Sequence, residues 1–333
     1  MAAYTTIDDP SAYFKVQLYT GDGSTPSITF DDTDTDMQPD LVWIKNRDAT
    51  DSHCLFDAVR GATEVLHADV NTAEVTDADT LTSFDSDGFA LGVDVKVNTN
   101  TEKYVAWNWK ESATAGFDIV SYAGNGTDDT DISHTLSATP NLIIVKNRDA
   151  ADSWQVYHSA NTSAPETDYL VLDTNVATAD AADRWSDEAP TSSVFTLGDG
   201  AEVNTNTENY IAYCFAEKQG FSKFGSYTGN GNADGAFIYT GFRPAFVLTK
   251  VYSTTEEWTL MDNKRPGYNN INLALMPNTT SGDSEATIID FFSNGFKFRD
   301  TATTINADGA TYVYAAFAEA PFVNSNGVPC NAR

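Results

Sequence analysis

The chain has 333 residues, of which 19 are Lys or Arg and 48 are Asp or Glu, so its formal net charge is −29. A protein that binds duplex nucleic acid needs clustered cations for the phosphates, and the few cations here are scattered among carboxylates. With 41% hydrophobic and 12% aromatic residues, the chain has enough apolar material for packed cores.

The first residues have no basic stretch followed by an apolar one, and no apolar run approaches the roughly 18 residues of a membrane helix. We therefore expect neither a signal for export nor insertion into a membrane. The three cysteines, Cys54, Cys214 and Cys330, show no CxxC spacing. They are expected to be reduced thiols of a protein made in the cytosol.

A threefold internal repeat organises the sequence. Each copy opens with an alternating strand that contains a tyrosine and runs into a glycine turn. These openings are residues 16–23, 120–126 and 225–231.

A second shared block is a proline followed by a nearly continuous apolar strand that ends on lysine. It occupies residues 39–48, 140–149 and 244–250, and the first two copies continue with Asn-Arg-Asp. A continuous apolar run of this length predicts a strand that is buried on both faces.

Each copy closes with an aromatic strand, at residues 104–110, 210–216 and 312–318. Alternation places Val105, Trp107 and Trp109 on one face, which predicts a half-buried strand. An asparagine turn precedes each closing strand. Helix is expected only in small pieces, such as residues 62–68.

The pattern predicts an all-β protein of three tandem jelly-roll-like β-sandwich repeats. The repeats cover residues 13–111, 116–218 and 220–320, and residues 321–333 form a C-terminal tail. Because the joints are short, we expect a compact or rod-like row of domains.

These blocks, together with Phe56-Asp57-Ala58-Val59-Arg60-Gly61, resemble a repeat family of structural proteins from tailed bacteriophages, notably marine and cyanobacterial ones. The closing segment at residues 314–322 is similar to the end of many tail and fibre proteins. The resemblance implies a non-enzymatic virion component whose sandwich units are similar to concanavalin-like and SPRY modules. It implies no catalytic residues.

The sequence offers candidates for two kinds of metal or catalytic site. The four histidines fall in different parts of the repeats, so surface or turn positions are favoured over zinc or a catalytic triad. The acidic runs between the glycine turn and the proline strand could supply oxygen ligands for Ca²⁺, although a solvated loop is the commoner outcome. The candidate ligands are Asp32, Asp34, Asp36, Asp129 and Asp131.

Tryptophans are candidates for stacking on sugar rings. Trp43, Trp107 and Trp109 lie on the shared strands and are expected in the core. Trp154 and Trp258 follow the apolar strand at matching places, where His53 stands in the first copy. They are expected to pack against a sheet, with a sugar platform as the alternative. Trp185 has no counterpart, so we expect it to be an exposed contact.

The recurrent Lys-Asn-Arg triplets are the other polar candidates. Arg47 and Arg148 could receive the carboxylate of a binding partner. The alternative, which we favour, is that they tie down their own acidic loops. Because the third copy lacks the Asn-Arg pair, we expect the third unit to be specialised as a cap or as the partner-facing end.

The leading hypothesis is an exposed tail fibre, spike or appendage of a virion, made in the host cytoplasm and assembled as a homo-oligomer, with a trimer favoured. It would bind a host-surface glycan or receptor, or other virion proteins. The alternative is a decoration protein that stabilises a capsid or tail. A glycan-degrading enzyme is a third hypothesis.

Overall fold

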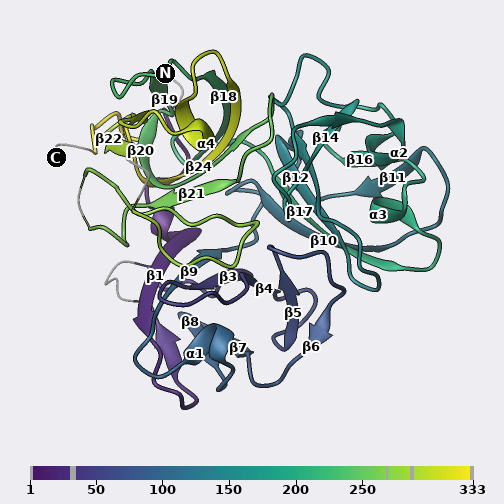
Figure 1. Cartoon of the computed structure of the whole chain (residues 1–333), viewed down its shortest axis with the longest axis horizontal. Coiled ribbons are helices and arrows are strands. Elements are labelled where there is room, and N and C mark those ends of the chain that lie inside the picture. The colour runs from purple at the N-terminus through teal and green to yellow at the C-terminus, as the bar shows by residue number, and fades with distance from the viewer. Residues whose placement is uncertain (1–2, 31–34, 268, 286–288, 331–333) are drawn as a thin grey trace.

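The computed structural model describes residues 3–30, 35–267, 269–285 and 289–330. It is all-β, and its sheets stack in a sandwich-like manner around apolar side chains. The strand ladders are antiparallel. Residues 14–109, 117–215 and 222–321 carry three separate sets of sheets. We call these stretches the first, second and third segments, and each forms one lobe of the molecule (Figure 1).

The first segment has a six-stranded sheet in the order β1-β9-β3-β4-β5-β6 and a three-stranded sheet in the order β2-β8-β7. The strands are β1 (Phe14–Thr20), β2 (Ser27–Thr29), β3 (Leu41–Asn46), β4 (Cys54–Asp57), β5 (Glu64–His67), β6 (Val75–Thr76), β7 (Leu81–Asp85), β8 (Gly88–Leu91) and β9 (Lys103–Trp109).

The second segment has the corresponding order β10-β17-β12-β13-β14-β15, with a small sheet of β11 and β16. Its strands are β10 (Phe117–Ala123), β11 (Thr130–Ser133), β12 (Leu142–Asn147), β13 (Gln155–His158), β14 (Asp168–Val171), β15 (Ala179–Asp180), β16 (Val194–Leu197) and β17 (Asn209–Phe215).

The third segment has the order β18-β24-β20-β21, with a small sheet in the order β19-β23-β22. Its strands are β18 (Ser222–Thr228), β19 (Phe237–Tyr239), β20 (Phe242–Val251), β21 (Thr259–Asp262), β22 (Ile289–Phe292), β23 (Gly295–Phe298) and β24 (Thr311–Pro321). In all three segments the closing strand lies between the opening strand and the apolar strand.

Helix is confined to single turns: η1 (Pro10–Ala12), α1 (Val95–Asn98), α2 (Ala182–Trp185), α3 (Ala201–Asn204) and α4 (Thr303–Asn306). The helix expected at residues 62–68 is wrong, because Glu64–His67 pairs with β4 as strand β5. In the part of the chain that the structure describes, no helix has the length and apolarity to cross a membrane.

The long sheets are apolar on both faces. On β3, Val42 and Ile44 point into the core of the first lobe. Leu41 and Trp43 point the other way, into a core that the three lobes share. The burial on both faces predicted for this strand is confirmed, since all six of its residues are buried.

The closing strand β9 differs from its predicted half-burial. Val105, Trp107 and Trp109 face the shared core, but Tyr104 and Ala106 on the other face are buried as well. The prediction is wrong because period-two patterning reports only the aromatic face, and it does not reveal that Tyr104 and Ala106 on the other face are buried in the core of the first lobe itself.

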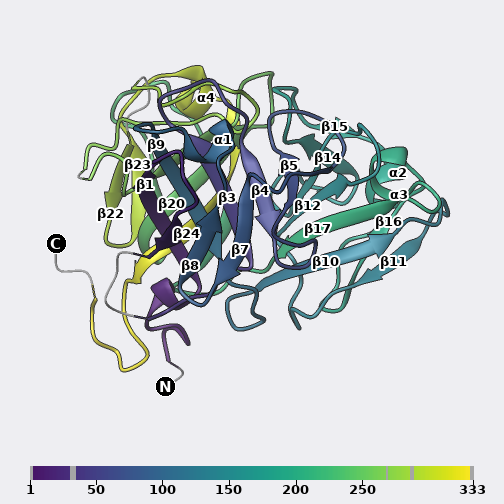
Figure 2. The ribbon, with the colours of Figure 1, turned by 90° about the horizontal axis from the view of Figure 1, so that it is seen from below.

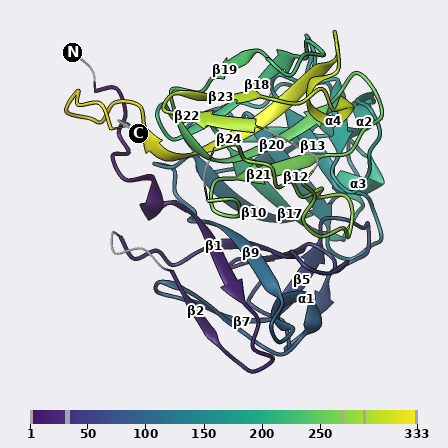
Figure 3. The same cartoon turned by 60° about the vertical axis from the view of Figure 1, so that its left-hand side comes forward.

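The three lobes surround a common centre rather than forming a row (Figure 1). Figure 3 shows β2 and β7 on one outer side and β19, β22 and β23 on another, with the long sheets between them. The described ends of the chain lie on the same side (Figure 2), where the Ser325 backbone N–H donates to Asp8 Oδ1 at 2.6 Å.

A buried asparagine explains why the glycine turn and the asparagine turn recur together. Asn98 is fully buried, and its amide group bonds the Asp22 N–H and the carbonyls of Ser24 and Gly92. Asn204 and Asn306 make the same three kinds of bond in the other lobes. At Gly21, a Cβ atom would lie 2.2 Å from the Thr99 carbonyl oxygen, so only glycine fits.

Paired tyrosines complete this arrangement. Tyr19 stacks on Tyr104 with ring centroids 5.0 Å apart, and the Tyr104 hydroxyl donates to the Val95 carbonyl at 2.7 Å. Corresponding pairs stand in the second and third lobes. The recurrent tyrosines are therefore structural, since they hold the single-turn helices onto the sheets.

Replacing Phe317 by alanine tests the shared core. Phe317 is 3% exposed, and its ring packs against rings of all three lobes, among them Phe14, Phe215 and Phe224. We expect Phe317→Ala to lower the free energy of unfolding by about 3–5 kcal/mol, with a single transition in chemical denaturation. Phe237→Ala, at a site that is 47% exposed, should cost less than about 1 kcal/mol. Separate transitions for the lobes would contradict a shared core.

Candidate functional site

The Lys-Asn pairs stabilise their own turns. Lys45 is fully buried, and its Nζ donates to the carbonyls of Asn46 at 2.7 Å and Ala49 at 3.1 Å. Lys146 repeats this pattern. Burial lowers the pKa of each of these two lysines to about 8. Asn46 bridges to Asp51 at 2.7 Å and Tyr104 at 3.2 Å.

The arginines of the triplets cross between lobes. Arg148 holds Glu74 of the first lobe through two bonds of 3.0 and 2.7 Å. Arg47 donates to Asp283 of the third lobe at 2.8 Å. The favoured internal role of the triplets agrees with these contacts in part, since Asn46 binds Asp51 of its own turn. The carboxylates that Arg47 and Arg148 bind belong instead to a neighbouring lobe, and not to their own acidic loops.

A second, fully buried arginine strengthens each of these contacts. Arg60 binds Asp57 and Glu74, and the Tyr213 hydroxyl of the second lobe donates to Asp57 at 2.8 Å. Arg265 binds Asp262 and Asp283 in the same way, and Trp107 Nε1 of the first lobe donates to Asp262 at 3.2 Å. The internal repeat of the sequence did not identify Asp262 and Arg265, although their Asp-x-x-Arg spacing matches that of Asp57 and Arg60.

The contact between the second and third lobes uses a histidine instead. His158 Nε2 lies 3.1 Å from the Tyr314 carbonyl oxygen, and its Nδ1 accepts the Ala160 N–H at 3.1 Å. Both bonds require the neutral ring with its proton on Nε2. Burial lowers the pKa of His158 to about 4.

One backbone hydrogen bond recurs at all three contacts. The N–H groups of Glu74, Thr178 and Asp283 donate to the carbonyls of Arg148, Tyr252 and Arg47, at 2.8, 3.0 and 2.9 Å. The first lobe thus donates to the second, the second to the third and the third to the first. The contacts close a ring within one chain.

The tryptophans are not available for stacking on sugars. Trp154 is fully buried and donates to the His67 carbonyl, and Trp258 is 3% exposed and donates to the Val171 carbonyl. Each of these bonds joins neighbouring lobes. Trp185 is 2% exposed and packs edge-on against Tyr157. Its expected exposure is wrong, because the helical turn α2 directs it into the core of the second lobe.

The candidate calcium ligands that the structure describes do not form a metal-binding group. Asp32 and Asp34 lie outside the described residues, and Asp36 is exposed. Ser186 Oγ donates to Asp129 at 2.5 Å, and Thr196 Oγ1 donates to Asp131 at 3.0 Å. Within the described ranges, no group of three or more His, Cys, Asp or Glu residues could hold a metal ion.

The expected surface positions of the histidines are also wrong, since His53, His134 and His158 are buried. His67 Nδ1 lies 3.7 Å from the Cys54 sulfur, a pairing that resembles a thiol nucleophile with its base. Cys54 is fully buried, however, and burial raises the pKa of its thiol. A buried thiol with a raised pKa is inert, so the pair has a structural role.

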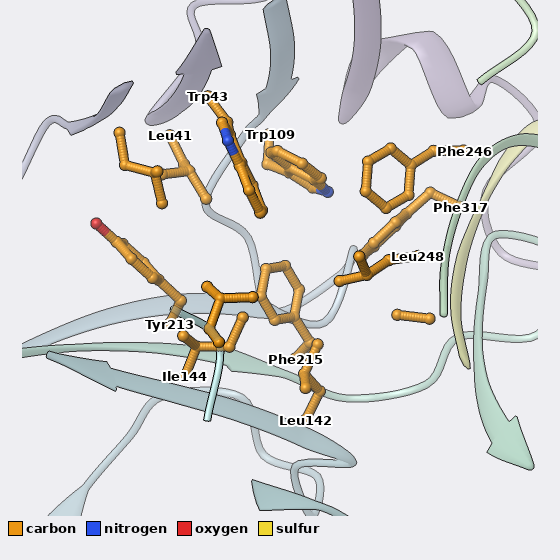
Figure 4. A pocket seen from close by; sticks show the side chains of 13 residues that line it. Leu41, Trp43, Trp109, Leu142, Ile144, Tyr213, Phe215, Phe246, Leu248 and Phe317 are labelled. Atoms are coloured by element: carbon orange, nitrogen blue, oxygen red, sulfur yellow. The ribbon is translucent and has the colours of Figure 1, made fainter. Parts of the chain in front are cut away.

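The shared core contains a cavity of about 30 Å³. Figure 4 shows Leu41, Trp43 and Trp109 of the first lobe facing residues of the other two lobes across this space. The opposing side chains include Leu142, Ile144, Phe215, Phe246, Leu248 and Phe317. Because its walls are apolar or aromatic and it is far smaller than an organic ligand needs, the cavity is a packing gap where three sheets meet.

The outer sheet of the third lobe differs from its counterparts. The outward residues of β19, Phe237 and Tyr239, are 47% and 53% exposed. Phe237 also packs edge-on against Phe292. At the matching positions, β2 has Ser27 and Thr29, and β11 has Asp131 and Ser133, all exposed. At these matching positions, aromatic side chains therefore face outward on the third lobe and not on the other two.

The third lobe also holds a polar pocket of about 200 Å³. Arg243, Asn263, Lys264 and Glu319 supply its polar groups, and Ile271 and Phe291 supply apolar walls. Sequence patterning did not reveal it, because its residues come from β20, β22, β24 and the loop after β21.

The fold and its contacts define a class of protein: an all-β, three-lobed scaffold whose polar signature joins one lobe to the next. A family defined by a domain of unknown function (DUF7483) matches residues 9–321. The chain belongs to this family. Since the match spans all three segments, the family's domain corresponds to the whole ring and not to a single lobe. Searches of curated proteins and of solved structures gave no match.

Replacing Glu74 tests the ion-pair contact between lobes. Burial alone would raise the pKa of Glu74, but the bonds and charges of Arg148 and Arg60 outweigh it, and the pKa lies below its ordinary value. Glu74→Gln should lower the free energy of unfolding at pH 7 by about 3 kcal/mol. A lowered pKa means that this stabilisation is fully present above the ordinary glutamate pKa of 4.5 and is lost as the pH falls below it, through the lower pKa of folded Glu74, so the variant and the parent should converge in acid.

Glu188→Gln, at an exposed carboxylate, is the control for Glu74→Gln in denaturant titrations. It should leave the free energy of unfolding unchanged both at pH 7 and in acid. An effect of Glu74→Gln as small as that of the control would contradict the bridging role.

Replacing His158 tests the third contact. Its pKa is lowered by folding, so the unfolded chain binds the proton more tightly, and stability should fall as the pH drops from about 6.5 toward 4. Gln can donate to the Tyr314 carbonyl and accept from Ala160 without titrating. His158→Gln should therefore remove on the order of 2 kcal/mol of that acid-induced loss, as measured by urea denaturation across this pH range. An unchanged pH dependence would show that His158 is not responsible.

Proposed function

We propose that the protein is a structural component of a bacteriophage virion, exposed as part of a tail fibre, spike or appendage, and that it binds the host surface without catalysing a reaction. The resemblance seen in the sequence supports this proposal. So does a rigid sandwich scaffold that presents loops and outer sheets, since binding residues commonly lie on such elements.

The observation that carries the proposal is the difference between the lobes. The recurrent polar residues are used between lobes, as Arg148 and Glu74 illustrate. The outward positions of β19 carry Phe237 and Tyr239, where the other lobes have small polar side chains. A scaffold with one specialised outer surface is suited to binding rather than to turnover, and the third lobe would be its partner-facing end.

We further propose that the three segments are tandem copies of one jelly-roll-like β-sandwich. The shared strand order and the repeated asparagine and tyrosine contacts support common descent of the segments. Because the ring closes within a single chain, a homo-oligomer such as a trimer would use outer surfaces of the lobes.

Labelling particles is the direct test. Antibody raised against the purified protein should decorate an appendage of intact virions in electron micrographs, and the free protein should slow phage adsorption to host cells. Phe237→Ala combined with Tyr239→Ala should weaken this competition, whereas Val95→Ala, on an exposed residue of the first lobe, should not.

Two results would redirect the proposal. Labelling of the capsid or tail without any effect on adsorption would favour the decoration protein, especially if added protein stabilises particles that lack it. Release of sugars from host polysaccharide would contradict the non-enzymatic role.

A further inference from the structure

The polar pocket of the third lobe lies beside a backbone hydrogen bond that recurs in all three lobes. The backbone N–H groups of Ala58, Ser159 and Asn263 donate to the carbonyls of Asp40, Asn141 and Ala245, at 2.8, 2.8 and 3.0 Å. These three bonds identify equivalent places in the three lobes.

In the first two lobes a polar side chain at this place has hydrogen-bond partners in its own surroundings. Asp40 accepts the Glu111 N–H at 2.7 Å. Asn141 accepts the Glu217 N–H at 2.8 Å and donates to Ser159 Oγ at 3.1 Å.

The third lobe has Ala245 instead, which offers no side-chain partner. The Oδ1 atom of Asn263 is buried there without a hydrogen bond. A buried acceptor without a partner is costly, unless a ligand or water donates to it.

In the pocket, two cationic side chains outnumber one carboxylate, whereas the protein as a whole is acidic. Arg243 pairs with Glu319 at 2.7 Å, and its side chain is 21% exposed. Lys264 is exposed, and no contact of its ammonium group with a described residue is seen. The matching residues in the other lobes are Gln38 and Thr139 for Arg243, and Val59 and Ala160 for Lys264. In a chain with a net charge of −29, two cations at one pocket favour an anionic ligand.

The other groups that line the pocket indicate which class of anion would fit it. Asn263 Oδ1 and the Glu319 carboxylate are acceptors, so the ligand must also bring hydrogen-bond donors. Inorganic phosphate or acetate brings few or none. Ile271 and Phe291 offer apolar walls, and about 200 Å³ is less than the roughly 300 Å³ at which pockets for drug-sized ligands begin.

We propose that this pocket binds one carboxylate-bearing sugar residue, a uronic acid of a polysaccharide. The sugar carboxylate would pair with Lys264 and Arg243, and its hydroxyl groups would donate to Asn263 and Glu319. The inference rests on the proposed host-surface function and names the ligand class for its third lobe.

Calorimetric titration of the intact protein with methyl glucuronide and methyl galacturonide tests the site. At least one of them should bind about tenfold more tightly than methyl glucoside, which lacks the carboxylate. Acetate and inorganic phosphate serve as the anions without a sugar ring. Equal binding of the neutral sugar, equal binding of phosphate, or no binding of either uronide would each overturn the proposal.

Lys264→Gln should weaken uronide binding about tenfold and leave the melting temperature unchanged, because the side chain is exposed. Lys103→Gln, at an exposed lysine on β9 of the first lobe, is the matched control and should bind like the parent. Unchanged affinity of Lys264→Gln would overturn the site.

The two proposals can fail separately. If the antibody labels virions but the purified protein does not bind either uronide, the pocket proposal alone is rejected. Uronide binding that depends on Lys264, with no labelling of particles, would keep the pocket and reject the virion role.

Discussion

Burial of a second apolar face is the constraint on which the whole structure depends. Each long sheet packs one face inside its own lobe and presents Leu, Trp, Ile or Phe side chains on the other. An isolated lobe would expose that second face to water, at a cost that grows with apolar area. Three lobes around one centre bury it, and Phe317 contacts rings from each of them.

The same constraint explains the buried polar groups at the lobe contacts. Arg60 and Arg265 are fully enclosed, and each is paired with carboxylates because an unpaired buried charge is costly. The third contact uses the neutral ring of His158 at the place of Asp57 and Asp262. All three contacts keep the same backbone hydrogen bond between lobes, although the side chains around that bond differ.

The third lobe differs most from the other two at its outer sheet and at its polar pocket. Both carry residues that their counterparts lack, such as Tyr239 and Lys264. We therefore place the proposed binding functions on this lobe. The repeated asparagine and tyrosine contacts are unchanged there, which shows that the scaffold was retained.

The sequence by itself determined the all-β class and the double burial of β3, because strand periodicity, apolar runs and glycine turns are local signals. It also indicated that the third segment is different. Tertiary structure alone decided that Trp185 is buried, that Arg47 and Arg148 reach neighbouring lobes, and that Arg243 and Lys264 share a pocket. These outcomes depend on contacts between residues far apart in the chain, and a single sequence carries no local signal of which distant surface will cover a given side chain.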